Sequence, residues 1–127
     1  MSACHLIDSV ILVDHLKGVK QATKWLASLR PGEGVISVIT RSEVLAGASD
    51  EDEPAVRSLL DSFDCLDITP AVADLAALLC RTGRMRQPDA FQAALALAHG
   101  LHLVTRNTKC FSERSHPFVR ISHTLSS

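Results

Sequence analysis

The chain has 127 residues, of which 46% are hydrophobic, and its formal net charge is -1. This length is that of one ordinary domain, so we expect a single domain over residues 1–127 that buries roughly two thirds of its unfolded surface. A net charge near zero excludes the global basic excess typical of many nucleic-acid binders, so a polyanionic substrate has to be held by local charge or by a metal.

Four isolated cysteines indicate free thiols rather than a zinc site or a disulfide framework. They form no CxxC pair, and three lie in apolar stretches typical of buried thiols. No apolar run approaches the roughly 18 residues that a membrane-spanning helix needs, and no signal peptide is visible. We therefore expect a soluble, cytoplasmic protein. The cysteines are Cys4, Cys65, Cys80 and Cys110.

The first part of the chain predicts two strands and a helix between them. Residues 3–7 are a short strand candidate, and the apolar run at 10–16 is compatible with either a strand or a helix. Residues 19–30 carry apolar side chains at helical spacing, with basic and amide side chains on the other face. The β-branched residues 35–39 predict the second strand.

Thr40 is the expected N-cap of a helix over residues 41–48. Glu43 follows three residues later, which completes a T-x-x-E capping box. A purely structural role for Glu43 therefore competes with a functional one. The acidic run 49–54 is expected to form a solvated turn that leads into a helix over residues 55–63.

The second half of the chain predicts two helices and three short strands. Thr69 and Pro70 have the N-cap and first-position pattern that opens a helix, and Gly100 has the pattern that ends one. The expected elements are a strand at 65–68, helices at 70–83 and 88–100, and strands at 101–105 and 118–122.

Helices alternating with short apolar strands indicate an α/β fold with a short, mainly parallel sheet flanked by helices. Such sheets bind ligands at the carboxyl ends of their strands. Asp8, Glu43 and Asn107 follow strand candidates, and Asp89 lies near the start of the helix before the fourth strand. We expect these oxygen-bearing side chains to converge on a Mg²⁺ or Mn²⁺ site.

Three segments of the chain resemble the PIN domain family and, within it, the small VapC-type toxins of bacterial toxin–antitoxin pairs. The segments are LIDSVILVDHL, ISVITRSEVLAG and RQPDAFQAALALAHGLHLVTRNTKCF. Each segment alone is a weak signal, but their order and spacing agree with the family over nearly the whole chain. The resemblance implies a single PIN-like domain.

The resemblance also implies a metal-dependent endoribonuclease that hydrolyses phosphodiester bonds of a structured RNA, either tRNA or rRNA. Asp8, Glu43 and Asp89 would be the catalytic, metal-binding carboxylates, and Asn107 would be a further ligand of Mg²⁺ or Mn²⁺. The implied partners are a cognate VapB-type antitoxin, the RNA substrate and other copies of the chain, in a homodimer or a toxin–antitoxin hetero-oligomer.

Two positions depart from the family pattern. Val10 stands where the family usually has a polar residue, and Cys110 stands where it commonly has an acid. A thiol offers little to Mg²⁺, which prefers oxygen ligands. The alternative is therefore a catalytically degenerate PIN domain that acts as a binding or complex-forming module.

Basic residues near the expected site suggest contacts with RNA phosphates, against the simpler interpretation of solvated surface charge. They are Arg84, Arg86, Arg106 and Lys109.

A different enzyme class would use Asp8 as a phosphorylated nucleophile, with Lys109 as its phosphate partner. That chemistry favours a second acid beside the nucleophile, whereas Ser9 and Val10 follow Asp8. We therefore favour the nuclease.

Overall fold

Short hydrophobic segments of this chain form five strands separated by six helices in residues 3–83, 85–106 and 118–123, the part that the computed structural model describes. The strands are β1 (His5–Ile7), β2 (Gly34–Ser37), β3 (Asp64–Leu66), β4 (His102–Thr105) and β5 (Val119–Ile121). The helices are α1 (Ser9–Leu16), α2 (Lys20–Ala27), α3 (Val38–Ala46), α4 (Glu53–Asp61), α5 (Pro70–Gly83) and α6 (Gln87–His99).

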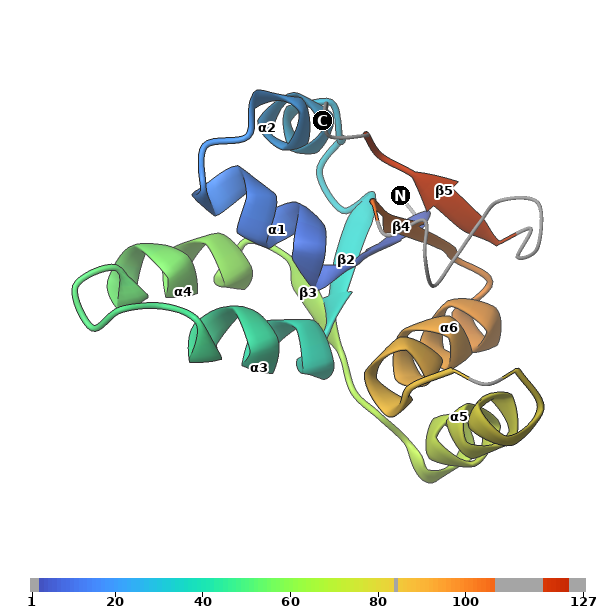
Figure 1. The fold of residues 1–127 in the computed structure, drawn as a ribbon. Coiled ribbons are helices and arrows are strands. Elements are labelled where there is room, and N and C mark those ends of the chain that lie inside the picture. The colour runs from blue at the N-terminus through green and yellow to red at the C-terminus, as the bar shows by residue number, and fades with distance from the viewer. Residues whose placement is uncertain (1–2, 84, 107–117, 124–127) are drawn as a thin grey trace.

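The five strands form one sheet in the order β3-β2-β1-β4-β5, with every neighbouring pair parallel (Figure 1). Parallel pairing brings the carboxyl ends of all strands to the same edge of the sheet. The α/β fold class and the parallel sheet predicted from the sequence are confirmed. Within the described residues, no helix is long and apolar enough to cross a membrane.

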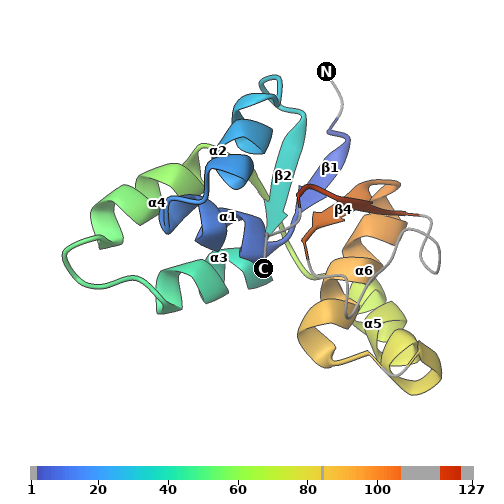
Figure 2. The same ribbon diagram turned by 45° about the horizontal axis from the view of Figure 1, so that its top comes forward.

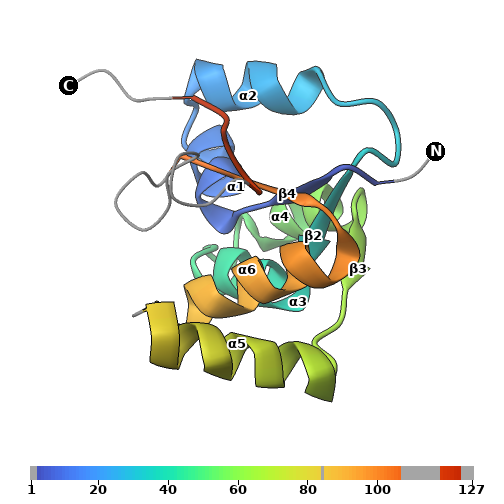
Figure 3. The same cartoon turned by 90° about the vertical axis from the view of Figure 1, so that its right-hand side faces the viewer.

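Helices cover both faces of the sheet because successive strand residues point to opposite sides. On β1 and β4, Leu6 and Leu103 belong to the core that packs against α5 and α6. The next residues, Ile7 and Val104, belong to the core beneath the four N-terminal helices. Figure 2 shows the sheet between α5 and α6 on one side and α1 to α4 on the other, and Figure 3 shows α5 and α6 side by side.

Several helix boundaries follow the capping chemistry of the sequence. Asp8 caps α1, because its Oδ1 accepts a hydrogen bond from the Ser9 backbone N–H at 2.8 Å, and this makes the ambiguous segment 10–16 helical. Thr69 Oγ1 accepts from the Val72 N–H at 3.2 Å, which confirms the predicted start of α5. Gly100 ends α6 in the left-handed conformation, with φ of 65°, as expected.

The predicted N-cap of α3 is wrong by one helical turn. Ser37, not Thr40, caps the helix, and its Oγ accepts from the Thr40 N–H at 3.0 Å. The β-branched Val38 and Ile39 favour a strand, but the Ser37 hydroxyl starts a helix there instead. Glu43 therefore lies beyond the first turn and is not part of a capping box.

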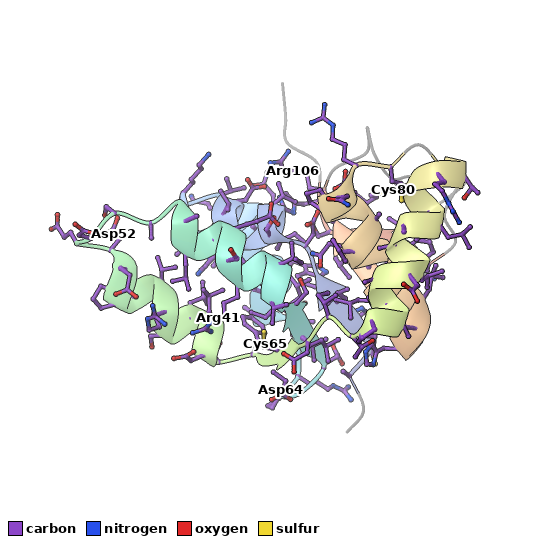
Figure 4. The ribbon with its side chains drawn as sticks, turned by 90° about the horizontal axis from the view of Figure 1, so that it is seen from below. Arg41, Asp52, Asp64, Cys65, Cys80 and Arg106 are labelled. Atoms are coloured by element: carbon purple, nitrogen blue, oxygen red, sulfur yellow. The ribbon has the colours of Figure 1, made fainter. Side chains whose placement is uncertain are left out.

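The predicted burial of the thiols is also wrong. Cys4 and Cys65 are exposed and Cys80 is half-buried, although all three are free. Cys65 lies on β3, an edge strand of the sheet, and Cys80 lies on α5 (Figure 4). Cys110 lies outside the described residues.

Candidate active site at the carboxyl edge of the sheet

Asp8 directly follows the central strand β1, and its carboxylate is held from two sides. Thr105, the last residue of the neighbouring strand β4, donates its hydroxyl to Asp8 Oδ2 at 2.7 Å. The Ser9 N–H donates to Oδ1 at 2.8 Å. The Asp8 backbone is fixed as well, because its N–H donates to the Val104 carbonyl at 2.9 Å.

The surroundings of Asp8 disfavour its charge. Burial raises the pKa of the Asp8 carboxyl above its ordinary value, and the negative charge of Asp89 raises it further. Hydrogen bonds from Thr105, Gln92 and the Ser9 N–H act in the opposite direction and do not cancel the rise. A buried carboxylate near a second acid is typical of functional sites.

Glu43 lies on α3 and keeps its side chain open to solvent. Desolvation raises the pKa of the Glu43 carboxyl, repulsion from Asp8 and Asp89 raises it further, and a hydrogen bond from the Ser9 side chain lowers it. The rise in pKa therefore indicates that the three acids lie within electrostatic reach of one another.

Asp89 lies in the first turn of α6, directly after Pro88, and is half-buried. The N-terminus of α6 lies at the carboxyl edge of the sheet, because the helix returns through Gly100 to β4. The structure therefore gathers Asp8, Glu43 and Asp89 from β1, α3 and α6, as the sequence predicted. Their catalytic and metal-binding roles stay predictions.

The three carboxylates suit a divalent cation by their chemistry. Their oxygens are hard ligands, and a cation between them would relieve the repulsion that raises the pKa of Asp8 and Glu43. Among the described residues, no three His, Cys, Asp or Glu side chains are close enough to hold one ion directly. Mg²⁺ commonly keeps several waters and takes only one or two carboxylates, so this donor set fits it.

A buried polar network behind Asp8 escaped the sequence analysis. Gln92 of α6 is 2% exposed, and its Oε1 accepts from the Ser37 hydroxyl at 2.6 Å. Its Nε2 donates to Thr40 Oγ1 at 2.9 Å and to Asp8 Oδ1 at 3.5 Å. One signal was available, since Gln92 interrupts the apolar run AFQAALALA of α6.

A second polar cluster ties α1 to the ends of β4 and β5. Asp14 of α1 is 4% exposed. Arg106 donates to it twice, from Nε to Oδ2 at 2.5 Å and from Nη2 to Oδ1 at 3.1 Å. His123 Nε2 lies 3.0 Å from Asp14 Oδ2, and its Nδ1 lies 2.7 Å from Ser122 Oγ. The bidentate ion pair fixes the backbone directly after Thr105.

The predicted phosphate contacts have different environments. Arg86 is exposed immediately before α6, three residues before Asp89. Arg106, labelled in Figure 4, is held by Asp14 and is 28% exposed, so a phosphate would compete with that ion pair. Arg84 and Lys109 lie outside the described residues. For all four, phosphate binding stays a prediction.

Of the two residues that depart from the family pattern, the structure describes Val10 but not Cys110. Val10 packs against the core between the sheet and the N-terminal helices, so its apolar side chain has a structural use there. Asn107, the expected fourth ligand, and Cys110 lie outside the described residues.

Comparison with known proteins identifies the family. The family model of the PIN domain matches residues 6–116. Ribonuclease VapC10 of Mycobacterium tuberculosis is 32% identical over 127 residues, covering 93% of this chain and 96% of that protein. Ribonuclease VapC19 of the same organism is 31% identical over 113 residues, covering 84% of this chain and 90% of that protein.

Solved structures agree with this result. A toxin–antitoxin complex from Klebsiella pneumoniae contains a chain with a TM-score of 0.88 and 34% identity, covering 98% of this chain and 100% of that one. The DNA-bound VapBC of Salmonella typhimurium shares the fold at a TM-score of 0.75 and 23% identity, covering 96% of this chain and 98% of that one. The chain therefore belongs to the PIN domain family, and its relatives there are VapC ribonucleases.

Proposed function

We propose that the protein is a metal-dependent endoribonuclease, the toxin of a VapBC-type toxin–antitoxin pair. The observation that carries the proposal is the placement of Asp8 after β1, Glu43 on α3 and Asp89 in the first turn of α6, where their charges raise the pKa of Asp8 and Glu43. The 32% identity to a VapC ribonuclease over 93% of the chain supports the same activity.

Asp8, Glu43, Asp89 and Asn107 would hold Mg²⁺ or Mn²⁺. The ion would supply an activated water and neutralise charge on the phosphate in an in-line displacement. The role of this chain is to keep the carboxylates in place, which Thr105 and the Ser9 N–H do for both oxygens of Asp8. Arg86, exposed at the start of α6, would bind an RNA phosphate and orient the scissile bond.

The proposed substrate is a structured RNA, tRNA or rRNA, in the cytoplasm. Proteins recognise such RNAs sequence-specifically at single-stranded loops, whose bases are free to leave the stack. A single acidic site with flanking arginines is suited to cutting one strand of such a loop, because the metal and the arginines engage only the phosphate backbone.

The first test is cleavage of total bacterial RNA by the purified chain, free of any partner. We expect discrete fragments with Mg²⁺ or Mn²⁺ and none with EDTA. Asp89→Asn should slow cleavage by about 100- to 1000-fold, the effect of removing about 3 to 4 kcal/mol of transition-state stabilisation. Sequencing the fragment ends would identify the RNA and the bond.

Asp74→Asn is the matched control, because Asp74 is an exposed carboxylate on α5. It should cleave at the wild-type rate. Full activity of both Asp89→Asn and Asp8→Asn would refute the site. No cleavage in any metal by folded wild-type protein would instead favour the binding module.

The proposed partner is a VapB-type antitoxin that docks beside the acids. A groove of about 390 Å³ lies between α1, α3 and α4. Apolar side chains dominate it, and Leu16 at the end of α1 is 44% exposed. The charged residues along it are Lys17, Glu43 and Asp52. Figure 4 labels Asp52 in the loop before α4. An amphipathic antitoxin segment with a basic residue near Glu43 would match this surface and block the metal site.

Leu16→Glu is expected to weaken binding of the cognate antitoxin by about tenfold or more, since a charge placed on an apolar anchor costs more than about 1 kcal/mol. Binding of each variant to surface-immobilised antitoxin would measure its affinity. Leu78→Glu on α5 is the control, because Leu78 is equally exposed, at 43%, and lies outside the groove. Equal affinities of the two variants would exclude docking in this groove. The RNA cleavage rate of both should stay that of wild type.

A further inference from the structure

Gln92 is a buried amide for which hydrophobic packing gives no reason. It is 2% exposed and lies on α6 among the alanines Ala90, Ala93 and Ala94, each 0% exposed. Burying an amide costs free energy unless its donors and acceptor are paired. The partners of Gln92 therefore indicate what the residue does.

The orientation of the Gln92 amide is fixed by its neighbours. Ser37 Oγ already accepts the Thr40 N–H as the cap of α3, so its hydroxyl proton is free to be donated to Gln92 Oε1, at 2.6 Å. This directs the NH₂ group to Thr40 Oγ1 at 2.9 Å and towards Asp8 Oδ1 at 3.5 Å. An ionised carboxylate only accepts hydrogen bonds, so Asp8 requires the same orientation.

These contacts connect the three elements that carry the acids. Gln92 lies one turn after Asp89 on α6, and Thr40 lies one turn before Glu43 on α3. The third contact is Asp8 itself, at the end of β1. A shift of α3 relative to α6 would break the two short hydrogen bonds of this network, and a shift of α6 relative to Asp8 would break the longer one.

We propose that Gln92 is a positioning residue that sets the mutual placement of Asp8, Glu43 and Asp89 for a divalent cation. The inference rests on the proposed function, because the cation is part of it. Gln92 touches neither the ion nor the RNA in this scheme. It acts by fixing the positions of the carboxylates. Its two short hydrogen bonds to Ser37 and Thr40 contribute most, because its contact with Asp8 is long.

The test is the affinity of the full chain for Mn²⁺, measured by electron paramagnetic resonance without RNA. Gln92→Met keeps the volume and removes the hydrogen bonds, and it should weaken Mn²⁺ binding by about 10- to 100-fold. Leu95→Ala on the same helix is the control. Leu95 is fully buried and outside the network, so this variant should lose stability and keep Mn²⁺ affinity.

A double-mutant cycle separates positioning from general loosening. In a Thr40→Val background, which already lacks the short hydrogen bond between Gln92 and α3, Gln92→Met should weaken Mn²⁺ binding much less than in the wild-type chain, because the two substitutions break the same network. Wild-type affinity in Gln92→Met, an equal loss in both backgrounds, or the same loss in Leu95→Ala would each overturn the proposal.

The outcome is distinguishable from a failure of the proposed function. If the wild-type chain binds Mn²⁺ but cuts no RNA, the nuclease proposal fails and the cycle still decides the role of Gln92. If the wild-type chain cuts RNA but binds no Mn²⁺, the nuclease proposal stands without its metal and the positioning proposal is overturned.

Discussion

Replacing Asp8 by asparagine is expected to abolish RNA cleavage and, in the absence of metal, to raise the midpoint of thermal unfolding. The loss of activity should be about 100- to 1000-fold or more, because a ligand carboxylate disappears from the site. The gain in stability follows from the raised pKa of Asp8, which means that the folded state disfavours the ionised carboxyl. A neutral side chain of the same shape removes that cost.

The hydrogen bonds of Asp8 can survive this substitution. The asparagine carbonyl can accept the Ser9 N–H as the N-cap of α1, and asparagine is a good capping residue. Its amide can donate to the Thr105 hydroxyl, which now donates to Asp8. We expect the midpoint to rise by about 2 to 5 °C, a stabilisation of about 1 kcal/mol.

Scanning calorimetry in EDTA and the RNA cleavage assay would measure the two effects on the same preparation. Asp74→Asn again serves as the control and should change neither quantity. A lower unfolding midpoint for Asp8→Asn would mean that the carboxylate stabilises the fold, and retained cleavage would remove Asp8 from the site.

The sequence was sufficient to predict the fold and the acids that the structure gathers. Asp8 follows an apolar strand and Asp89 opens a helix, and both signals are local. Parallel pairing then brings the carboxyl ends of β1, β2 and β4 to one edge of the sheet, whatever sequence the loops have. This is why Asp8 and Asp89 could be predicted to converge although they are far apart in sequence.

The support of those acids could not be predicted, because it depends on contacts between distant residues. Ser37 and Gln92 are 55 positions apart. From its neighbours in sequence, Ser37 reads as an ordinary strand residue and Gln92 as an ordinary helix residue. The error at Thr40 has the same origin. Val38 and Ile39 favour a strand, and only the three-dimensional placement of Ser37 against α6 shows where the helix begins.

A second set of contacts between distant residues, which the sequence could not predict, is the cluster of Asp14, Arg106 and His123. The partners lie 92 and 109 positions from Asp14. In sequence, Arg106 resembles a free phosphate ligand and Asp14 a surface residue of an amphipathic segment. The fold instead buries Asp14 and makes it the acceptor for both.

Replacing Asp14 by asparagine is therefore expected to destabilise the protein by about 3 kcal/mol at neutral pH. The substitution removes the charge that pairs with Arg106 and leaves the buried His123 with a weaker acceptor. Urea unfolding would measure the loss. Asp61→Asn is the control, because the ion pair of Asp61 with Arg41 lies at the surface, with Asp61 60% exposed, and should contribute at most about 1 kcal/mol.

The pH dependence of this loss gives a sharper test. Burial alone would raise the pKa of Asp14, but hydrogen bonds and charge from Arg106 and His123 outweigh it and lower the pKa below its ordinary value of 3.8. A carboxyl with a lowered pKa in the folded state contributes stability that is fully present above its unfolded pKa and is lost as the pH falls through its folded pKa. The stability difference between wild type and Asp14→Asn should therefore be present above about pH 5 and shrink below about pH 4. A difference that stays constant down to pH 3, or grows there, would show that the Asp14 charge is not what ties α1 to the ends of β4 and β5.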